Sequence, residues 1–428
     1  MITRSKVMAA GTTAALTIAV LAGCSQPAPT TPDGTAPPEE RTLEILTWTY
    51  DAESKAWWDR VNGAFEDANP GVTVHMEQSD FGAIIGDFVT QSTAGEVADV
   101  VHIPAPVLTV LGWAESGFLA PLGDWLEDTG LGADLHEVQS SMELNGETYG
   151  LVFAFNAAML FYNAGLLEDA GVGVPTTPEE FVAAAAALTG HSGGDGYGFA
   201  VTDDESVNFV TEVLSFIVGM EGEYVTNGDW SFAAPKVVAA VDVWREMASN
   251  TAPRGTNLSA KRTAFDTGSV GMMLDWPFYY AASIRSASPD VADQVTLAEP
   301  PFPVTPLFIS QGFGVSAQSD QTDLAKSWLE FAMAEDAQRY YAELEPVIPA
   351  NQKALSVLGE NPATQPILDA LDRAELIIPS EFTGMRTNSS EFRTLFTGAF
   401  RQLLQTDQDT SEAMQAFDEA LRSAGIEP

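Results

Sequence analysis

The chain has 428 residues, of which 19 are basic and 60 are acidic, so its formal charge is −41 at pH 7. Such an acidic surface repels phosphate backbones and anionic lipid head groups, which argues against nucleic acid as a partner. Hydrophobic residues make up 45% of the chain, a share that suits folded cores rather than a disordered protein.

The first 23 residues are typical of an export signal. Arg4 and Lys6 precede an apolar run, Val7 to Ala22, that is short for a membrane span. Cys24 follows small residues, as at the cleavage site of a lipoprotein signal peptidase. It is the only cysteine, so it has no partner for a disulfide or a metal site. We predict a signal peptide over 1–23 and a lipid anchor on Cys24 at the extracellular face of the cytoplasmic membrane.

Residues 24–42 predict a flexible tether, because they are rich in Pro and Thr and lack large apolar side chains. Without the signal peptide, which holds two basic residues and no acidic ones, the charge becomes 17 − 60 = −43. The remaining 405 residues (428 − 23) are enough for two lobes. No other stretch approaches about 20 uninterrupted apolar residues.

Strands and helices alternate from residue 43 onward. Leu43–Trp48, Val72–Met76 and Ala98–Ile103 predict strands. Between the first two, Trp57, Trp58, Val61, Phe65 and Ala68 recur at helical spacing, and Ile84, Ile85, Phe88 and Val89 mark a second helix. This β-α-β-α-β order predicts an α/β fold with a parallel sheet, whose ligand crevice lies beyond the carboxyl ends of the strands.

The later part of the chain predicts more helices, with strands between them. We expect helices at Pro178–Leu188, Val207–Val218, Lys236–Ser249, Leu324–Met333, Thr364–Glu375 and Ser411–Ala424. We expect strands at Gly150–Ala154, Tyr197–Val201, Val270–Leu274 and Phe313–Ser316.

Several short segments, taken in this order, carry a family resemblance. They are Phe65–Val72 (FEDANPGV), Asp99–Val101, Ala114–Leu122 (AESGFLAPL), Asn145–Leu151 (NGETYGL), Leu160–Asn163, Ala170–Val172, Pro175–Phe181, Gly268–Met273 after Phe265, and Gly312–Ser316 leading into Ala325–Phe331. With these segments the chain resembles the maltose-binding type of extracellular solute-binding protein that serves bacterial ATP-driven importers.

The resemblance implies a type II periplasmic-binding-protein fold, in which two α/β lobes flank a ligand cleft and the chain crosses between them three times. We place the crossings near Val152–Asn156, Leu307–Gln311 and Pro346–Asn351. The N-terminal lobe would comprise 43–152 plus 308–347, and the C-terminal lobe 157–306 plus 352–428. The expected function is capture of a small solute, a mono- or oligosaccharide, and its delivery to an ABC permease. We predict a monomer without catalytic residues, metal or cofactor.

Sugar-binding clefts combine flat aromatic rings with planar polar groups. The candidates near the expected cleft are Trp48, Asp51, Gln78, Asp80, Phe81, His102, Phe153, Phe155, Asp204, Asn208, Asp275, Trp276, Phe278, Gln311, Gly312 and Arg386. The resemblance places a stacking aromatic just after Val270–Leu274, at Trp276 or Phe278. Trp48 faces either the cleft or the helix that follows it, and Phe153 and Phe155 either line the cleft or fill the sheet. Arg386 either serves as a cleft cation or neutralises nearby acids.

One motif favours a different class of protein. Gly190–Gly194 (GHSGG) fits the G-x-S-x-G elbow of α/β-hydrolases, but that elbow needs a strand before Ser192, whereas a helix pattern precedes it here. The four histidines are scattered, and no phosphate-binding loop is present. The alternative is therefore a lipid-anchored hydrolase of glycans or esters, and a third possibility is an adhesion or scaffold lipoprotein.

Overall fold

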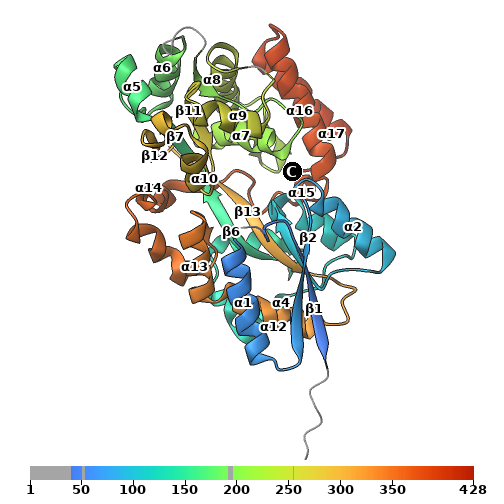
Figure 1. Cartoon of the computed structure of the whole chain (residues 1–428). Coiled ribbons are helices and arrows are strands. Elements are labelled where there is room, and N and C mark those ends of the chain that lie inside the picture. Colours follow the sequence, from blue (N-terminus) through green and yellow to red (C-terminus); the bar gives the residue numbers. More distant parts are fainter. Residues whose placement is uncertain (1–39, 51–53, 191–195, 254) are drawn as a thin grey trace, which may run out of the picture. The chain divides into compact units, whose positions relative to one another are not determined.

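A computed structural model describes residues 40–50, 54–190, 196–253 and 255–428. The predicted signal peptide, Cys24 and most of the predicted tether lie outside the described residues, as do Asp51 and Ser192. The described chain contains two main sheets, each accompanied by its own helices (Figure 1). None of the described helices is both long and apolar enough to cross a membrane.

The first sheet has the order β14-β6-β13-β3-β1-β2, and β15 pairs with the start of β13. Its strands are β1 (Arg41–Thr47), β2 (Val72–Gln78), β3 (Val100–Pro104), β6 (Leu151–Ala157), β13 (Thr305–Val315), β14 (Ile348–Pro349) and β15 (Ala374–Leu376). The strands β2 and β3 both pair with β1 in parallel, which confirms the predicted β-α-β-α-β unit. The strand β13 runs antiparallel to both β3 and β6, so the sheet is mixed.

The second sheet has the order β12-β7-β11-β8. Its strands are β7 (Met159–Asn163), β8 (Tyr197–Ala200), β11 (Val270–Asp275) and β12 (Val295–Ala298). Two small ribbons pair β4 (Glu143–Leu144) with β5 (Glu147–Thr148), and β9 (Val225–Thr226) with β10 (Asp229–Trp230). In Figure 1, β6 and β13 extend between the elements of the two sheets.

Helices and short 3-10 turns cover the sheets. Those in the first part of the chain are α1 (Lys55–Ala68), α2 (Ile84–Ala94), η1 (Pro106–Leu108), α3 (Val110–Glu115), α4 (Gly123–Thr129), η2 (Leu131–Asp134) and η3 (Glu137–Met142). The middle part has α5 (Ala164–Ala170), α6 (Pro178–Leu188), α7 (Val207–Gly219), α8 (Pro235–Asn250), α9 (Leu258–Asp266), α10 (Tyr279–Ser286) and α11 (Pro289–Ala292). The last part has α12 (Thr322–Met333), α13 (Glu335–Leu344), η4 (Gln352–Glu360), α14 (Gln365–Asp369), η5 (Ala370–Arg373), α15 (Thr383–Thr387), α16 (Ser389–Gln405) and α17 (Thr410–Ser423).

Local chemistry explains where the best-predicted helices begin and end. The helix α6 starts at Pro178, and its N-cap Thr177 accepts a hydrogen bond from the Glu180 N–H, so both start signals act together. The helix α1 buries Trp57, Trp58, Val61 and Phe65 on one face, and a tight turn with Gly71 at φ 89° follows it.

Two predictions need correction. The predicted helix Thr364–Glu375 is instead the short α14, the 3-10 turn η5 and the start of β15. The predicted strand Phe313–Ser316 is only the end of the 11-residue β13. Residues 352–376, expected in the second lobe, include η4, which packs on α13, and β15, which pairs with β13. We therefore propose that the third crossing lies after residue 376, later than predicted.

Gly198 lies where β8 passes very close to α6. A Cβ atom at this position would lie 1.8 Å from the Ala185 carbonyl oxygen. We expect Gly198→Ala to lower the free energy of unfolding by about 3 kcal/mol, because the backbone must move to relieve the clash. Urea denaturation measures the change.

The matched control is Gly398→Ala in α16, where an added Cβ meets no atom within 4 Å. It should leave stability unchanged or raise it by up to about 1 kcal/mol, since alanine favours a helix over glycine. Equal unfolding midpoints for the two variants would contradict the close approach of β8 to α6.

Candidate functional site

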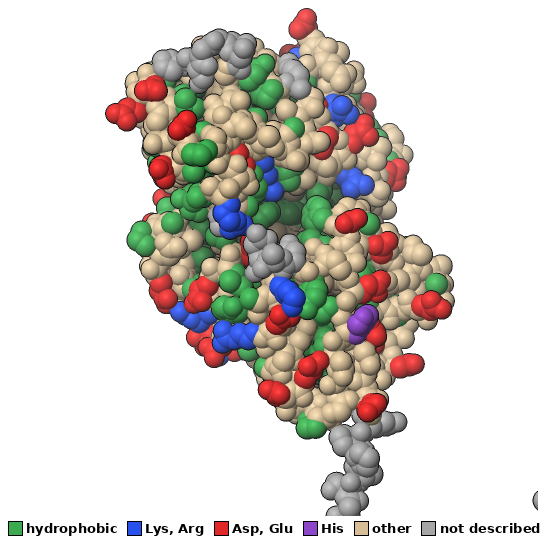
Figure 2. All heavy atoms as spheres, in the orientation of Figure 1, with side chains coloured by type: hydrophobic (Ala, Val, Ile, Leu, Met, Phe, Trp, Pro, Cys, Tyr) green, Lys and Arg blue, Asp and Glu red, His purple; other side chains and the backbone are tan. Residues whose placement is uncertain are grey.

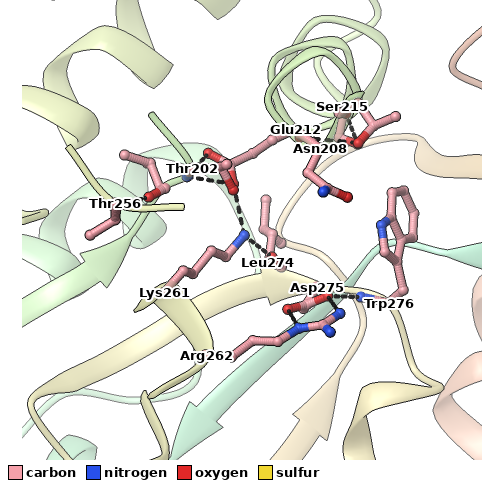
Figure 3. Close-up of polar contacts among 12 residues, drawn as sticks. Thr202, Asn208, Glu212, Ser215, Thr256, Lys261, Arg262, Leu274, Asp275 and Trp276 are labelled. Atoms are coloured by element: carbon pink, nitrogen blue, oxygen red, sulfur yellow. Dashed lines mark hydrogen bonds and ion pairs between the residues drawn. The ribbon is translucent and has the colours of Figure 1, made fainter. Parts of the chain in front are cut away.

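A small cavity lies beside the end of β11. It is lined by Ala158, Thr202, Asn208, Thr211, Glu212, Ser215, Leu258, Lys261, Leu274, Asp275 and Trp276. Most of these side chains come from α7, α9 and the end of β11, as Figure 3 shows for the polar ones. The cavity therefore lies at the segment where the sequence predicted a stacking aromatic.

A buried ion pair forms one wall of this cavity. The Lys261 ammonium lies 2.7 Å from the Glu212 carboxylate and donates a second hydrogen bond to the Leu274 carbonyl, also at 2.7 Å. The Thr202 N–H and hydroxyl complete the shell around the Glu212 carboxylate. Burial raises the pKa of Glu212, and the nearby Lys261 opposes that shift.

A second ion pair fixes the end of β11. The Arg262 guanidinium donates two hydrogen bonds, of 2.8 and 2.9 Å, to the Asp275 carboxylate. The Trp276 backbone N–H donates to the same carboxylate at 2.7 Å. Burial opposes ionisation of Asp275, but Arg262 outweighs it and lowers the pKa of Asp275 below its usual range. Asp275 thus holds the backbone of Trp276, and its own charge is already neutralised.

Two polar groups at the cavity have no hydrogen-bond partner among the described residues. Within the described part of the chain, the Asn208 amide and the Trp276 indole N–H form no hydrogen bond with the protein. Both side chains are half-buried, and Figure 3 shows the Asn208 amide directed toward the space between the Glu212–Lys261 pair and Trp276. Trp276 in turn stacks on Phe308 of β13, with 5.5 Å between ring centroids. An amide beside a supported indole ring can serve a ligand with hydroxyls and a C–H face.

The small cavity shares Asn208 with a larger open cleft. This cleft is lined by side chains of α2, η1 and α3 on one side and of α7 and α16 on the other. Phe81 and Ile85, which are 55% and 41% exposed, form an apolar part of its lining. Figure 2 shows a hollow in which hydrophobic side chains gather, while acidic side chains are spread over the rest of that face.

Trp48, Phe81 and His102 come together at the carboxyl ends of the first sheet's strands, as predicted. Trp48 is half-buried, lies 3.9 Å from the His102 ring in a stacked arrangement, and meets Phe81 edge-on at 6.0 Å. His102 is completely buried. Burial lowers the pKa of His102 to about 3, so this imidazole stays neutral at physiological pH.

Several predicted site residues lie away from both cavities. Phe153 and Phe155 are fully buried, which corresponds to the alternative in which they fill the sheet. Gln78 and Asp80 are exposed near the end of β2, and Asp204 accepts hydrogen bonds from the backbone and side chain of Ser206.

The remaining predicted residues differ in accessibility. Gly312 is buried where β13 meets β6, and Gln311 is 9% exposed. Phe278 is half-buried, and Arg262 lies over its ring at 5.3 Å.

Arg386 is too deeply buried to serve as a cleft cation, and it forms no ion pair with an acid among the described residues. Its side chain is fully buried, and the guanidinium donates hydrogen bonds to the carbonyls of Val107, Ser380 and Ser141. Burial lowers its pKa to about 10, which still leaves it charged at neutral pH. Arg386 thus ties α15 to η1 and to η3.

Sequence reasoning missed the ion pairs of Lys261 and Arg262. One signal was available for Glu212, because it is the only charged residue in the largely apolar α7 segment. Its partner Lys261 lies 49 residues further on, and no local pattern connects the two. The described residues contain no group of three or more metal-ligating side chains that could hold an ion.

The hydrolase alternative loses its local support. Ser192 lies outside the described residues, but the element before it is the helix α6, whereas the elbow needs a strand there.

Comparison with known proteins extends over most of the chain. The sequence profile of bacterial extracellular solute-binding proteins matches residues 63–368. A mannitol-binding protein of Pseudomonas aeruginosa is 21% identical over 399 residues, which cover 86% of this chain and 90% of the relative.

Two solved structures have the same fold. The GacH receptor of Streptomyces glaucescens, known unliganded and in complex with acarbose, is 21% identical, with a TM-score of 0.76 over 89% of this chain and 97% of its own. An ABC transporter solute-binding protein of Thermotoga lettingae, bound with α-D-tagatose, is 19% identical, with a TM-score of 0.77 over 90% of this chain and 99% of its own. The predicted two-lobed fold is confirmed.

His102→Phe tests the neutral buried imidazole. In the unfolded chain a histidine titrates near 6.5, whereas His102 in the folded protein titrates near 3. The wild-type protein therefore loses stability as the pH falls from 6.5 toward 3, because His102 binds a proton in the unfolded chain but stays neutral in the folded chain. Between pH 7 and 4.5 its free energy of unfolding should fall by about 2 kcal/mol more than that of the variant. Urea denaturation of both proteins at both pH values measures this. An equal fall of the free energy of unfolding in the wild type and in the variant would contradict it.

Proposed function

We propose that this chain, which belongs to the bacterial extracellular solute-binding proteins, captures a neutral carbohydrate in its cleft and delivers it to the permease of an ABC importer. The family is one of binding proteins rather than enzymes, and its members act outside the cytoplasm. The relatives named with acarbose, tagatose and mannitol support the carbohydrate class. The named ABC transporter protein supports the permease partner.

The observation that carries the proposal is the pairing of charges around the small cavity. Lys261, the cation that lines the cavity, is paired with Glu212, and the lining carboxylate of Asp275 is paired with Arg262. A charged ligand bound against these residues would lose its hydration without gaining a counter-ion. The free-energy cost of its desolvation would therefore not be offset. The groups left for the ligand are the Asn208 amide and the half-buried Trp276 ring, which suit the hydroxyls and C–H face of a sugar.

The anchoring and assembly parts of the proposal come from the sequence. We propose that Cys24 carries the lipid that holds the protein on the extracellular face of the cytoplasmic membrane. We also propose that the protein acts as a monomer, because closure around one ligand needs no second subunit.

Binding to a panel of sugars tests the function. Calorimetry should detect a neutral mono- or oligosaccharide, and the matching uronate or amino sugar should bind about tenfold more weakly or worse, because its charge has no partner in the cavity. Asn208→Ala and Trp276→Ala should each weaken sugar binding about tenfold, since each removes a direct contact. Asn250→Ala, an exposed residue at the end of α8, is the control that should keep the wild-type affinity. Binding of charged ligands alone would overturn the neutral class.

Cys24→Ser tests the lipid anchor. The wild-type protein should fractionate with membranes and the variant should be released, because a serine cannot form the thioether to the lipid. Immunoblots of both fractions measure this, and equal membrane retention of the two proteins would contradict the anchor.

A further inference from the structure

Four rings form a continuous series from the cleft to the core of the first sheet. Phe81 is exposed, Trp48 is half-buried, and His102 and Phe313 are fully buried. His102 stacks on Trp48 at 3.9 Å and 18°, and Phe313 lies 4.8 Å beyond at 29°. One face of the Trp48 indole is therefore covered by His102, so its exposed part is the opposite face or the ring edges.

Both nitrogens of His102 have partners, and these partners fix its tautomer. The Nε2 atom lies 3.1 Å from Gln311 Oε1, which also accepts the Tyr341 hydroxyl at 2.9 Å. Because this oxygen can only accept, Nε2 carries the proton and donates it. The Nδ1 atom then accepts from Thr47 Oγ1 at 3.0 Å.

The network also holds the backbone beside Trp48. Thr49 Oγ1 accepts from the Trp58 indole N–H at 3.1 Å and lies 3.4 Å from His102 Nδ1. Thr47 and Thr49 flank Trp48 in the chain, and the Thr49 N–H donates to Thr47 Oγ1 at 3.2 Å. The imidazole is thus bonded to the residues on both sides of the ring that it supports. A rotation of the His102 ring would break its hydrogen bonds to Gln311 and to Thr47.

Gln311 connects this network to the strand that runs between the two sheets' elements. It lies at an irregularity in the pairing of β13 with β6, where the register shifts on either side of it. Such a bulge re-aims a side chain relative to a regular strand. Here the Gln311 amide points to His102, so β13 directly contacts the residue that supports Trp48.

We propose that His102 is a positioning residue that holds the Trp48 indole ready to stack on a sugar ring, with Gln311 anchoring His102 to β13. His102 cannot contact the ligand itself, since it is fully buried and both of its nitrogens are engaged. The part played by the sugar rests on the proposed function. The support of Trp48 by His102 does not rest on the proposed function, and it can be measured without a ligand.

The first measurement is spectroscopic. The difference between the near-ultraviolet circular dichroism of the wild type and of Trp48→Phe isolates the signal of a fixed Trp48. In a His102→Ala background this difference should shrink to less than about half, because an indole without its stacking partner gains rotational freedom. An undiminished difference would overturn the proposal, whatever ligand the protein binds.

The second measurement is a double-mutant cycle on sugar affinity. Trp48→Ala and His102→Ala should each raise the Kd about tenfold, but His102→Ala should change it less than about twofold when Trp48 is already Ala, because His102 acts through Trp48. Additive effects in a folded double variant would overturn the proposal. If the wild type binds no sugar, the proposed function fails, and the spectroscopic result alone decides the role of His102.

Two further variants separate positioning from general loss of stability. His102→Phe keeps a flat ring under Trp48 but loses the hydrogen bonds to Thr47 and Gln311, so it should restore part of the circular dichroism difference and give a Kd between those of His102→Ala and the wild type. Phe417→Leu removes a ring from the separate cluster around α16 and α17. It should reduce stability without changing the Trp48 signal. Failure of His102→Phe to restore either readout, or loss of the Trp48 signal in Phe417→Leu, would contradict the proposal.

Discussion

The candidate site depends on the position of one buried strand, β13. Phe308 on this strand stacks against Trp276, Gln311 accepts a hydrogen bond from His102, and Phe313 packs against His102. Neighbouring strands pair with β13 on both sides, so it cannot slip by one residue without turning these side chains to the opposite face of the sheet. The two aromatic platforms, Trp48 and Trp276, therefore take their positions from the same element.

The buried ion pairs are better understood as a constraint on the ligand than as a source of stability. Removing an ammonium and a carboxylate from water costs several kcal/mol per ion, and their attraction only roughly offsets that cost. Glu212 and Lys261 also bind the Thr202 N–H and the Leu274 carbonyl, and Asp275 also binds the Trp276 N–H. Their observable effect is to fix the backbone around the cavity in one arrangement and to leave that wall without a net charge.

Much of the fold could be predicted from local pattern. The helix α6 was predicted with its observed bounds because Thr177, Pro178 and the alanine run all favour the same start and the same conformation. β13 was predicted only in its last part, because Ser310 and Gln311 interrupt the apolar pattern of a central strand. Those two polar residues are satisfied by Asn156, Tyr341 and His102 from distant elements, which no local window contains.

For the site, the sequence could indicate which strand ends meet but not which side chain at each end is left uncovered. His102 and Arg386 were both among the candidate ligand contacts, and both side chains are completely buried. A polar side chain can satisfy its hydrogen bonds either with a ligand or with the backbone of a neighbouring segment, and the residue type is the same in both cases. The difference is set by the segment that packs over it, such as Trp48 on His102. Within the described part of the chain, by contrast, the Asn208 amide and the Trp276 indole N–H form no hydrogen bond with the protein, which is why we propose these two residues as ligand contacts.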